Sequence, residues 1–455
     1  MFVGREKEIK QLLSYLNRNS QENIVIYGRR RIGKSYLIKE VLKRYNKPFI
    51  FYQAKETTEE DNIISLSKLV AIHYNLGNIV FNSFEAILEF VFSKDDGLVF
   101  VIDEYPYLRE VSVGLDSVIQ KVIDKYKNKS SLKLILLGSY IDIMSKLNEV
   151  DNPLYGRIFM MFITKMDYYD ASLFYPNVDL ETKVKYYSVF DGIPYYNSLI
   201  KAEESFEENI KRIIIDQNSQ LGDFMEVTLS KELRKINGAN SVFSIIASGV
   251  SKFNDILSRL QGFSSPSLSS ILNNLIKMDL IKKVTPINEP DNSRRTYYEI
   301  NDNFIDFYYR YIFKNNSSRA ILNSSDFYNE IIKEDFNENF VPKKFEKIAF
   351  EYLIRENKAG NIKPSFLKIG KYWYDNPIEK VNGEFDVVTK DKDGFIVFEV
   401  KYTNKKVDSK VIEKLVKQLD KCNVKYYKLG FFSKSGFAIK DKEQYYLKSL
   451  EDMYQ

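Results

Sequence analysis

Cysteine and histidine are almost absent from this sequence, which has one of each among its 455 residues. Cys422 alone forms neither an internal disulfide nor a zinc site built on cysteines. His73 alone excludes histidine-rich metal centres and catalytic triads within one chain, and its helical surroundings predict a packing or surface role. Any catalysis by this chain must therefore rest on carboxylates, lysines and metal ions.

Long apolar runs are missing as well. No stretch of about 20 apolar residues is present that would span a membrane, and the opening MFVGREKEIKQLL lacks the apolar core of a signal peptide. We therefore expect a cytoplasmic protein with no membrane partner. Charge of one sign is not in large excess either, and the net charge of +5 permits nucleic-acid binding without demanding it.

A phosphate-binding motif is present near the amino end. Residues 24–35 read IVIYGRRRIGKS, an apolar strand followed by G-x-x-x-x-G-K-S, the P-loop pattern. Gly28 and Gly33 let the backbone turn tightly and direct its N–H groups at phosphate oxygens. Lys34 reaches the β- and γ-phosphates, and the Ser35 hydroxyl completes the shell of a bound Mg²⁺. The helix that begins at the loop adds the positive end of its dipole.

The positions between the two glycines are Arg29, Arg30, Arg31 and Ile32. We expect the backbone of these residues to contact phosphate while the arginine side chains point into solvent. A nucleic-acid-binding patch is the alternative interpretation of three consecutive arginines.

A second apolar segment ends in two acids. Residues 98–104 read LVFVIDE, a buried parallel-type strand that closes with Asp103 and Glu104. In P-loop enzymes an acid at the tip of such a strand holds Mg²⁺, and a neighbouring glutamate polarises the attacking water as a general base. The alternative is that the two acids only cap the following turn.

The length predicts two to four domains, and 44% hydrophobic residues are enough for packed cores. Strands and amphipathic segments alternate up to about residue 170, which predicts an α/β fold with a parallel sheet covered by helices on both faces. The ligand is then expected beyond the carboxyl ends of the strands. The predicted division is a P-loop core at 1–174, a helical lid at 175–238, a winged helix at 239–310, a linker at 311–340 and a C-terminal α/β domain at 341–455.

The winged-helix prediction rests on three short helical segments followed by two strands. The third helix begins at a turn with Ser264 and Pro266, which suit a helix start. Its exposed face, and the loop between the two strands, offer the side chains of Ser267, Ser269, Asn273, Lys277, Arg294 and Arg295. Because this helix has little basic charge, the sequence leaves open whether the module contacts DNA or is a packing unit.

The C-terminal domain contains a second group of carboxylates. In GEFDVVTKDKDGFIVFEVKYT, Asp386 lies in one strand and Glu399 and Lys401 in the next, joined by a D-K-D-G turn. Two carboxylates and a lysine around one point suit Mg²⁺-dependent phosphodiester cleavage, in which the acids hold the metal and the lysine orients water. Glu346, on the helix that opens the domain, is a further candidate metal ligand. The alternative is a solvated hairpin whose Glu399 and Lys401 form a surface ion pair.

The amino-terminal half resembles the archaeal-type ATPases of the STAND/AAA+ group. The similar segments are FVGREKEIKQL at the start, GSYIDIM at 138–144, PLYGRI at 153–158 and DGIPYY at 191–196. The resemblance implies ATP as the nucleotide, Ser139 as a sensor that contacts it, and Arg157 as an arginine finger or sensor. Asp191 replaces the first glycine of the family's G-G-x-P-x-Y turn, which weakens any prediction that this turn contacts nucleotide.

The C-terminal part resembles the restriction-endonuclease-like domains of the PD-(D/E)xK superfamily. Glu346, Asp386, Glu399 and Lys401 fall on its four signature positions, and Phe385 replaces the proline before the aspartate.

Three functions are compatible with these features. The leading hypothesis is an ATP-hydrolysing regulatory protein with a metal-dependent nuclease domain, in DNA processing or defence. The alternatives are a nucleotide-gated switch or scaffold that binds nucleic acid or protein without cleaving it, and a DNA-binding regulator. The sequence predicts ATP and Mg²⁺ as ligands and leaves open DNA and further copies of the chain as partners.

Overall fold

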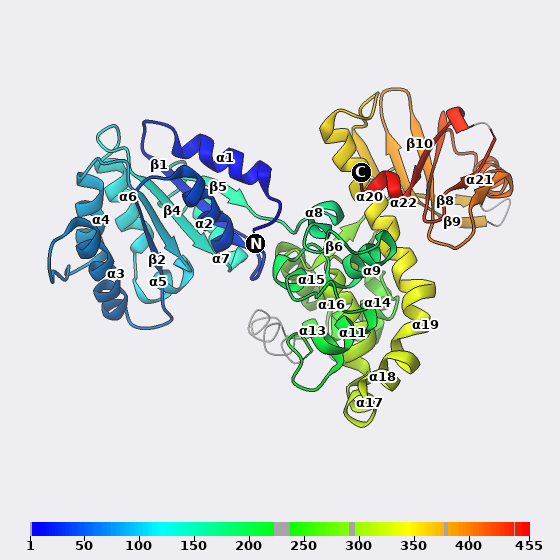
Figure 1. Cartoon of the computed structure of the whole chain (residues 1–455), viewed down its shortest axis with the longest axis horizontal. Helices are drawn as coiled ribbons and strands as arrows, with labels where there is room; N and C mark the ends of the chain where they lie inside the picture. Colours follow the sequence, from blue (N-terminus) through cyan, green and yellow to red (C-terminus); the bar gives the residue numbers. More distant parts are fainter. Residues whose placement is uncertain (1, 223–236, 291–295, 377–380, 441) are drawn as a thin grey trace. The chain divides into compact units, whose positions relative to one another are not determined.

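The computed structural model describes residues 2–222, 237–290, 296–376, 381–440 and 442–455 (Figure 1). The chain divides into two compact units, which are described separately. Unit 1 is Met1–Met166 with Ile193–Tyr195, and unit 2 is Asp167–Gly192 with Tyr196–Gln455. Within the described ranges, no helix is both long and apolar enough to cross a membrane.

Unit 1 is built on a five-stranded sheet in the order β2-β3-β4-β1-β5. All of its strand pairs are parallel, which confirms the predicted α/β fold. The strands are β1 (Glu22–Tyr27), β2 (Phe49–Gln53), β3 (Val99–Asp103), β4 (Lys133–Gly138) and β5 (Phe159–Phe162). Strands β3 and β4 are buried along their whole length, as the central strands of a parallel sheet must be.

Helices connect these strands and cover the sheet. They are α1 (Glu6–Leu16), α2 (Lys34–Tyr45), α3 (Glu59–Tyr74), α4 (Phe84–Ser93), α5 (Tyr105–Val111), α6 (Leu115–Lys125) and α7 (Ile141–Ser145). Thr58 and Ser83 cap the first turns of α3 and α4 by accepting backbone N–H bonds. The carboxyl ends of β1, β3 and β4 meet at one edge of the sheet, and the P-loop, the acidic pair and Ser139 follow these three ends.

The first part of unit 2 is helical. It contains α8 (Tyr168–Ser172), α9 (Leu180–Phe190) and α11 (Phe206–Ile210), while the short α10 (Pro194–Asn197) runs across the boundary between the units. Next come α13 (Ala239–Ala247), α14 (Phe253–Arg259) and α15 (Ser265–Lys277), followed by an antiparallel hairpin of β6 (Ile281–Val284) and β7 (Tyr297–Ile300). Three helices and a hairpin are thus present in the predicted order. Arg294 and Arg295 lie outside the described residues.

The segment 311–340, which we expected to be a linker, is helical. It consists of α17 (Asn316–Ile321), α18 (Ser324–Phe327), α19 (Lys333–Asp335) and single π-helical turns, and it runs directly into α20 (Val341–Ala359). The reason is a set of aromatic rings at helical spacing that pack on one another. Phe336 contacts Phe307 and Phe340, and Phe340 also contacts Tyr311. The Asn/Ser-rich composition of the segment made these packed aromatic residues hard to predict from the sequence.

The C-terminal part of unit 2 is a second five-stranded sheet, in the order β14-β12-β10-β9-β8. The strands are β8 (Lys368–Asn376), β9 (Val381–Lys390), β10 (Phe395–Lys401), β12 (Lys428–Ser433) and β14 (Tyr445–Ser449). Strands β9 and β10 form the predicted hairpin, whose turn is held by two backbone N–H bonds to the Asp391 carboxylate. Helix α21 (Ser409–Lys421) packs on the apolar core of this sheet, and α22 (Leu450–Met453) closes the chain.

Candidate functional site

The loop after β1 has the tight backbone that its glycines predict. A Cβ atom at Gly28 would lie 2.4 Å from the Ile163 carbonyl oxygen, so no side chain fits there. Gly33 has a φ of +89° and forms the N-cap of α2. Arg31 also lies in the left-handed region, at φ 68°, which costs a non-glycine residue about 1 kcal/mol. The backbone is therefore tightly turned where the loop enters α2, as a phosphate-binding loop requires.

Lys34 is buried at the first turn of α2, and its ammonium is held by the loop itself. Its Nζ donates to the carbonyl oxygens of Gly28 at 2.8 Å and Arg29 at 2.9 Å. The same Nζ lies 3.0 Å from the Ser139 hydroxyl, which comes from the end of β4. The predicted sensor serine and the P-loop lysine are thus brought together, although they are far apart in the sequence.

Ser35 and Asp103 form the second contact of the site. The Ser35 hydroxyl donates to Asp103 Oδ2 at 2.7 Å, and Asp103 Oδ1 accepts the Glu104 N–H at 3.0 Å. A hydroxyl oxygen and a carboxylate oxygen facing each other are the hard ligands that Mg²⁺ prefers. The donor set therefore fits the predicted ion, with Ser35 and Asp103 as the residues that would hold it.

Glu104 lies beside this pair with an unusual environment. Its Oε1 accepts a bond from the Ser139 hydroxyl at 3.3 Å, while its Oε2 is buried and has no hydrogen-bond partner among the described residues. Burial and the neighbouring Asp103 carboxylate raise the pKa of Glu104, although Lys34 and Arg30 partly oppose this. A carboxylate with one unbonded oxygen and a raised pKa is suited to accept a proton from water.

The arginines of the loop do not point freely into solvent, so that expectation was wrong. Arg30 donates to the hydroxyls of Tyr107 at 3.0 Å and Tyr140 at 3.1 Å. The Arg31 guanidinium lies 4.1 Å from the ring centre of Tyr195. Guanidinium groups stack well on aromatic faces, which explains this arrangement. The three tyrosines come from distant segments. Tyr140 and Tyr195 lie in the family-like segments 138–144 and 191–196, but no sequence pattern predicted their contacts with the loop arginines.

The DGIPYY segment also reaches the loop. The position of a Cβ atom on Gly33 would be 3.6 Å from Pro194 Cγ, an ordinary van der Waals contact. Pro194 and Tyr195 belong to unit 1, whereas Asp191 belongs to unit 2. The Asp191 carboxylate is fully buried there and accepts from Lys347 Nζ at 3.0 Å and the Asn303 N–H at 3.0 Å. Asp191 is thus a structural anchor of unit 2.

Arg157 lies apart from the P-loop within unit 1. It precedes β5 at the amino edge of the parallel sheet, where its carbonyl accepts from Asn23 at the start of β1. Its guanidinium makes two bonds to Asp124, at 2.8 and 3.0 Å. The P-loop follows the carboxyl end of β1, so the length of that strand separates Arg157 from the nucleotide loop of the same chain.

The predicted C-terminal residues do gather at one place. Asp386 lies in β9 where this strand bulges against β8, and bulges often redirect side chains beside functional sites. Glu346 faces it from α20. Burial, followed by the Asp386 carboxylate, raises the pKa of Glu346 to about 8, and burial also raises the pKa of Asp386. Glu399 and Lys401, at the end of β10, form an ion pair with each other, and neither side chain is buried.

An additional lysine, which the sequence analysis did not identify, faces these carboxylates. The Lys371 ammonium lies 2.9 Å from Glu384 and 3.8 Å from Asp386 and from Glu299. Among the described residues, no group of three or more metal-ligating side chains is assembled. In this arrangement Lys371 lies beside Asp386 and Lys401 pairs with Glu399, and Asp386, Glu399 and Glu346 are not assembled as a metal centre.

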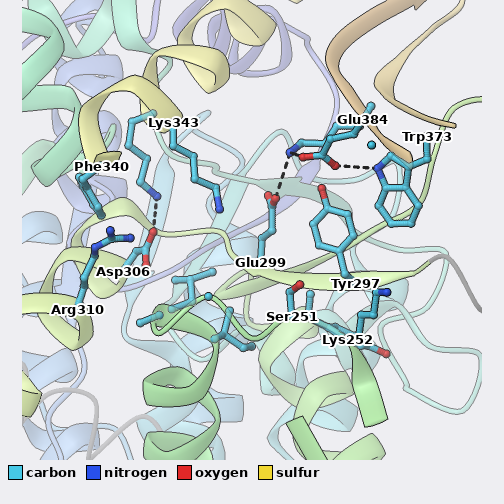
Figure 2. A pocket seen from close by; sticks show the side chains of 18 of the residues that line it. Ser251, Lys252, Tyr297, Glu299, Asp306, Arg310, Phe340, Lys343, Trp373 and Glu384 are labelled. Carbon is cyan, nitrogen blue, oxygen red and sulfur yellow. Dashed lines mark hydrogen bonds and ion pairs between the residues drawn. The ribbon is translucent and has the colours of Figure 1, made fainter. Parts of the chain in front are cut away.

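The hairpin of the predicted winged helix joins the edge strand β8. The Tyr297 ring stacks on Trp373 with centres 4.9 Å apart. Asn288 exchanges two bonds with the Trp373 backbone, and the Ile287 N–H donates to the Lys371 carbonyl at 2.7 Å. Figure 2 shows the cleft of about 550 Å³ beside this joint, where Tyr297 and Glu299 of the hairpin lie close to Trp373 and Glu384. Of the side chains on α15, Ser267, Asn273 and Lys277 are exposed and Ser269 is half-buried.

Comparisons with known proteins match the two ends of the chain separately. A family model described as "ATPase domain predominantly from Archaea" matches residues 2–200, and the DUF234 model, "Archaea bacterial proteins of unknown function", matches residues 308–412. The "Uncharacterized ATP-binding protein MJ0423" of Methanocaldococcus jannaschii is 43% identical over 53 residues, 11% of this chain and 90% of that one. The Walker-type ATPase PABY2304 of Pyrococcus abyssi has the same fold over 68% of this chain and 96% of its own, with a TM-score of 0.53 and 21% identity.

A relative along most of the chain defines the family. The "Uncharacterized protein MJECL04" of Methanocaldococcus jannaschii is 34% identical over 378 residues, which cover 82% of each chain. The chain therefore belongs to the family of MJECL04, and it is a P-loop ATPase of the archaeal type whose C-terminal part contains a DUF234 domain.

Proposed function

We propose that this ATPase uses Lys34, Ser35, Asp103, Glu104 and Ser139 as its catalytic machinery. The observation that carries the proposal is the meeting of three strand ends, where Lys34 contacts Ser139 and Ser139 contacts Glu104. The loop amides and Lys34 bind the β- and γ-phosphates, and Ser139 reports on the γ-phosphate. Glu104 takes the proton of the attacking water.

Ser35 and Asp103 would hold Mg²⁺, which when bound neutralises charge on the phosphates. The backbone of Gly28, Arg29, Arg30, Arg31, Ile32 and Gly33 completes the cradle. Arg30 and Arg31 stiffen this cradle by stacking on tyrosines, so that the amides stay directed inward. We assign the chain to the STAND/AAA+ group on this basis.

Exchange of the loop lysine tests the proposal. Lys34→Ala should weaken ATP binding by roughly 100-fold or more, because it removes a charged donor from both phosphates. Lys39→Ala, an exposed lysine on the same helix, is the matched control and should bind ATP as the wild type does. Isothermal titration calorimetry measures both, and equal affinities of the two variants would contradict the assignment.

For the C-terminal domain we propose a metal-dependent nuclease-like site, with Asp386, Glu399 and Glu346 as metal ligands and Lys401 beside the attacking water. Support comes from the position of Glu346 beside Asp386 and from the raised pKa values of both, because two half-buried acids that resist ionisation together favour a divalent cation. Formation of this site requires Lys401 to leave Glu399.

The second candidate is a switch or scaffold whose hairpin and C-terminal domains bind without cleavage. The Glu399–Lys401 ion pair and the position of Lys371 favour it, because ammonium groups already neutralise the acids. Incubation of the full chain with plasmid and single-stranded DNA, in Mn²⁺ or Mg²⁺ and with or without ATP, separates the two functions. Products that disappear in Asp386→Ala identify a nuclease, and intact DNA in every condition supports the switch.

A further inference from the structure

One face of α21 is a row of lysines. Lys410, Lys414, Lys417 and Lys421 follow one another at intervals of four, three and four residues, which places them along one side of a helix, and all four are exposed. These four residues are called the α21 lysine face below. The opposite side of the helix, with Ile412, Leu415 and Leu419, is buried in the core of the C-terminal sheet. The lysine face therefore points outward on a rigid support.

Three lysines of other helical segments are paired with an acid one turn earlier. Lys146, Lys185 and Lys211 each form an ion pair with a carboxylate four residues earlier, at 3.0 to 3.2 Å. Lys410, Lys414 and Lys417 make no ion pair with any residue that the structure describes, although Glu413 lies on the same helix.

Like charges four residues apart destabilise a helix by a few tenths of a kcal/mol per pair. Lys410 with Lys414 is such a pair, and an anion bound beside it would relieve this cost.

The lysines line a groove rather than a flat surface. A hollow of about 600 Å³ runs beside α21, and Tyr374 and Asn382 form its other wall. The same two residues also line the cleft of about 550 Å³ that contains Glu384 and Lys343, so the two hollows meet at the β8–β9 edge. Asp386 follows Glu384 by two residues on β9. A chain-like ligand lying along α21 would thus be directed past Tyr374 toward the carboxylates.

We propose that the α21 lysine face binds the sugar-phosphate backbone of a nucleic acid. At 1.5 Å rise per residue the face is about 16 Å long, a length that contains about five phosphates of one strand when measured along the axis of a B-form duplex. A membrane surface fits less well, because α21 exposes no large apolar side chain and an interfacial helix must insert one. The inference rests on the proposed C-terminal function for the choice of nucleic acid over an acidic protein, and binding itself does not require cleavage.

The test measures binding in the absence of chemistry. A fluorescent 30-nucleotide single strand and a 30-base-pair duplex, of DNA and of RNA, are titrated with the full chain in EDTA without ATP, at 50 to 300 mM NaCl. The variant Lys410→Gln/Lys414→Gln/Lys417→Gln should bind at least 10-fold more weakly at 100 mM salt. Because each lysine that contacts phosphate adds about one to the salt dependence, the slope of log affinity against log salt should fall by about two to three.

The control Lys7→Gln/Lys10→Gln/Lys43→Gln removes the same charge from exposed positions of α1 and α2 and should change neither quantity. Equal losses in both triple variants, or no binding of any nucleic acid by the wild type at 50 mM salt, would overturn the proposal. The proposal would also be overturned if the α21 triple variant lost binding to polyglutamate or to phosphatidylserine vesicles but bound nucleic acid as the wild type does. Because neither metal nor ATP is present, these outcomes are independent of whether the carboxylate site cleaves.

Discussion

At the scale of single residues, Asp103 and Glu104 are adjacent acids with different surroundings. Asp103 accepts bonds from Ser35 and from a backbone N–H, so its oxygens are oriented toward the phosphate loop. Glu104 is buried with one unbonded oxygen and a raised pKa. Environment rather than residue type therefore assigns the metal-ligand role to Asp103 and the base role to Glu104 in our proposal.

The raised pKa of Glu346 predicts that the free energy of unfolding depends on pH. Its pKa of about 8 in the folded chain lies above the value of about 4.5 for a free glutamate, so the folded state holds the proton more tightly. This contribution is present at low pH and is lost as the pH rises toward 8. In the wild type we therefore expect the free energy of unfolding to fall by roughly 1–3 kcal/mol between pH 5 and 8.5. The variant Glu346→Gln should not show this fall. Urea unfolding at several pH values measures it.

Glu338→Gln is the control, since Glu338 is exposed and lies on the same helical segment. The pH profile of that variant should match the wild type. A Glu346→Gln profile that also matches the wild type would show that Glu346 ionises freely in the folded chain.

The sequence predicted the residues whose partners are local or belong to a known motif. Gly28, Gly33, Lys34 and Ser35 follow a fixed spacing, so their positions around the loop required no tertiary information. Tyr107 and Tyr140 beside Arg30, and Lys371 beside Asp386, come together only through the fold. The edge position of Arg157 could have been predicted from the sequence, because a residue that precedes a parallel strand lies at the amino end of that strand, away from the ligand.

At the scale of elements, the P-loop depends on the close approach of β1 to the chain after β5. Gly28→Ala would place a methyl group 2.4 Å from the Ile163 carbonyl, so the loop or β5 must move. We expect the variant to lose roughly 1–3 kcal/mol of stability and to bind ATP weakly. Thermal unfolding with and without ATP checks both effects.

Gly370→Ala is the control for that experiment, because a methyl group there would make only an ordinary contact of 3.5 Å with Ile287. It should unfold near the wild-type temperature. A Gly28→Ala variant that binds ATP with full affinity would mean that the loop adapts without loss of its phosphate-binding shape.

Strands were easier to predict than the helices of unit 2. The apolar runs in residues 24–27 and 99–102, which were predicted as strands, lie in β1 and β3 of the parallel sheet. The segment 311–340 was predicted to be an Asn/Ser-rich linker with helical fragments, and it is helical over most of its length. Within it Phe336 and Phe340, which are four residues apart, pack on each other, and Phe340 also packs on Tyr311. The side-chain period was therefore more informative than the composition.

For the molecule as a whole, the position of Arg157 links ATP hydrolysis to the association of several copies of the chain. An arginine at the amino edge of the sheet can act on ATP only in a neighbouring copy of the chain. If it does, ATP turnover per chain should rise with protein concentration, and Arg157→Ala should lower turnover by about 10-fold or more with little change in ATP affinity. Steady-state rates across a 100-fold concentration range, with light scattering, measure this.

Arg18→Ala provides the comparison, because Arg18 forms an exposed ion pair with Glu22 at the same edge of the sheet. It should leave turnover unchanged. Strictly proportional rates from a monomeric chain, together with a wild-type rate for Arg157→Ala, would restrict Arg157 to its structural pair with Asp124.

If Glu104 activates water for ATP hydrolysis, loss of its carboxylate must slow the chemical step, and the single-turnover rate of Glu104→Gln measures this step. The account predicts a fall of about 10² to 10⁴ in that rate with ATP affinity preserved, because only proton acceptance is lost. Glu110→Gln, an exposed glutamate on the following helix, should hydrolyse ATP at the wild-type rate. Hydrolysis by Glu104→Gln at the wild-type rate would contradict the account.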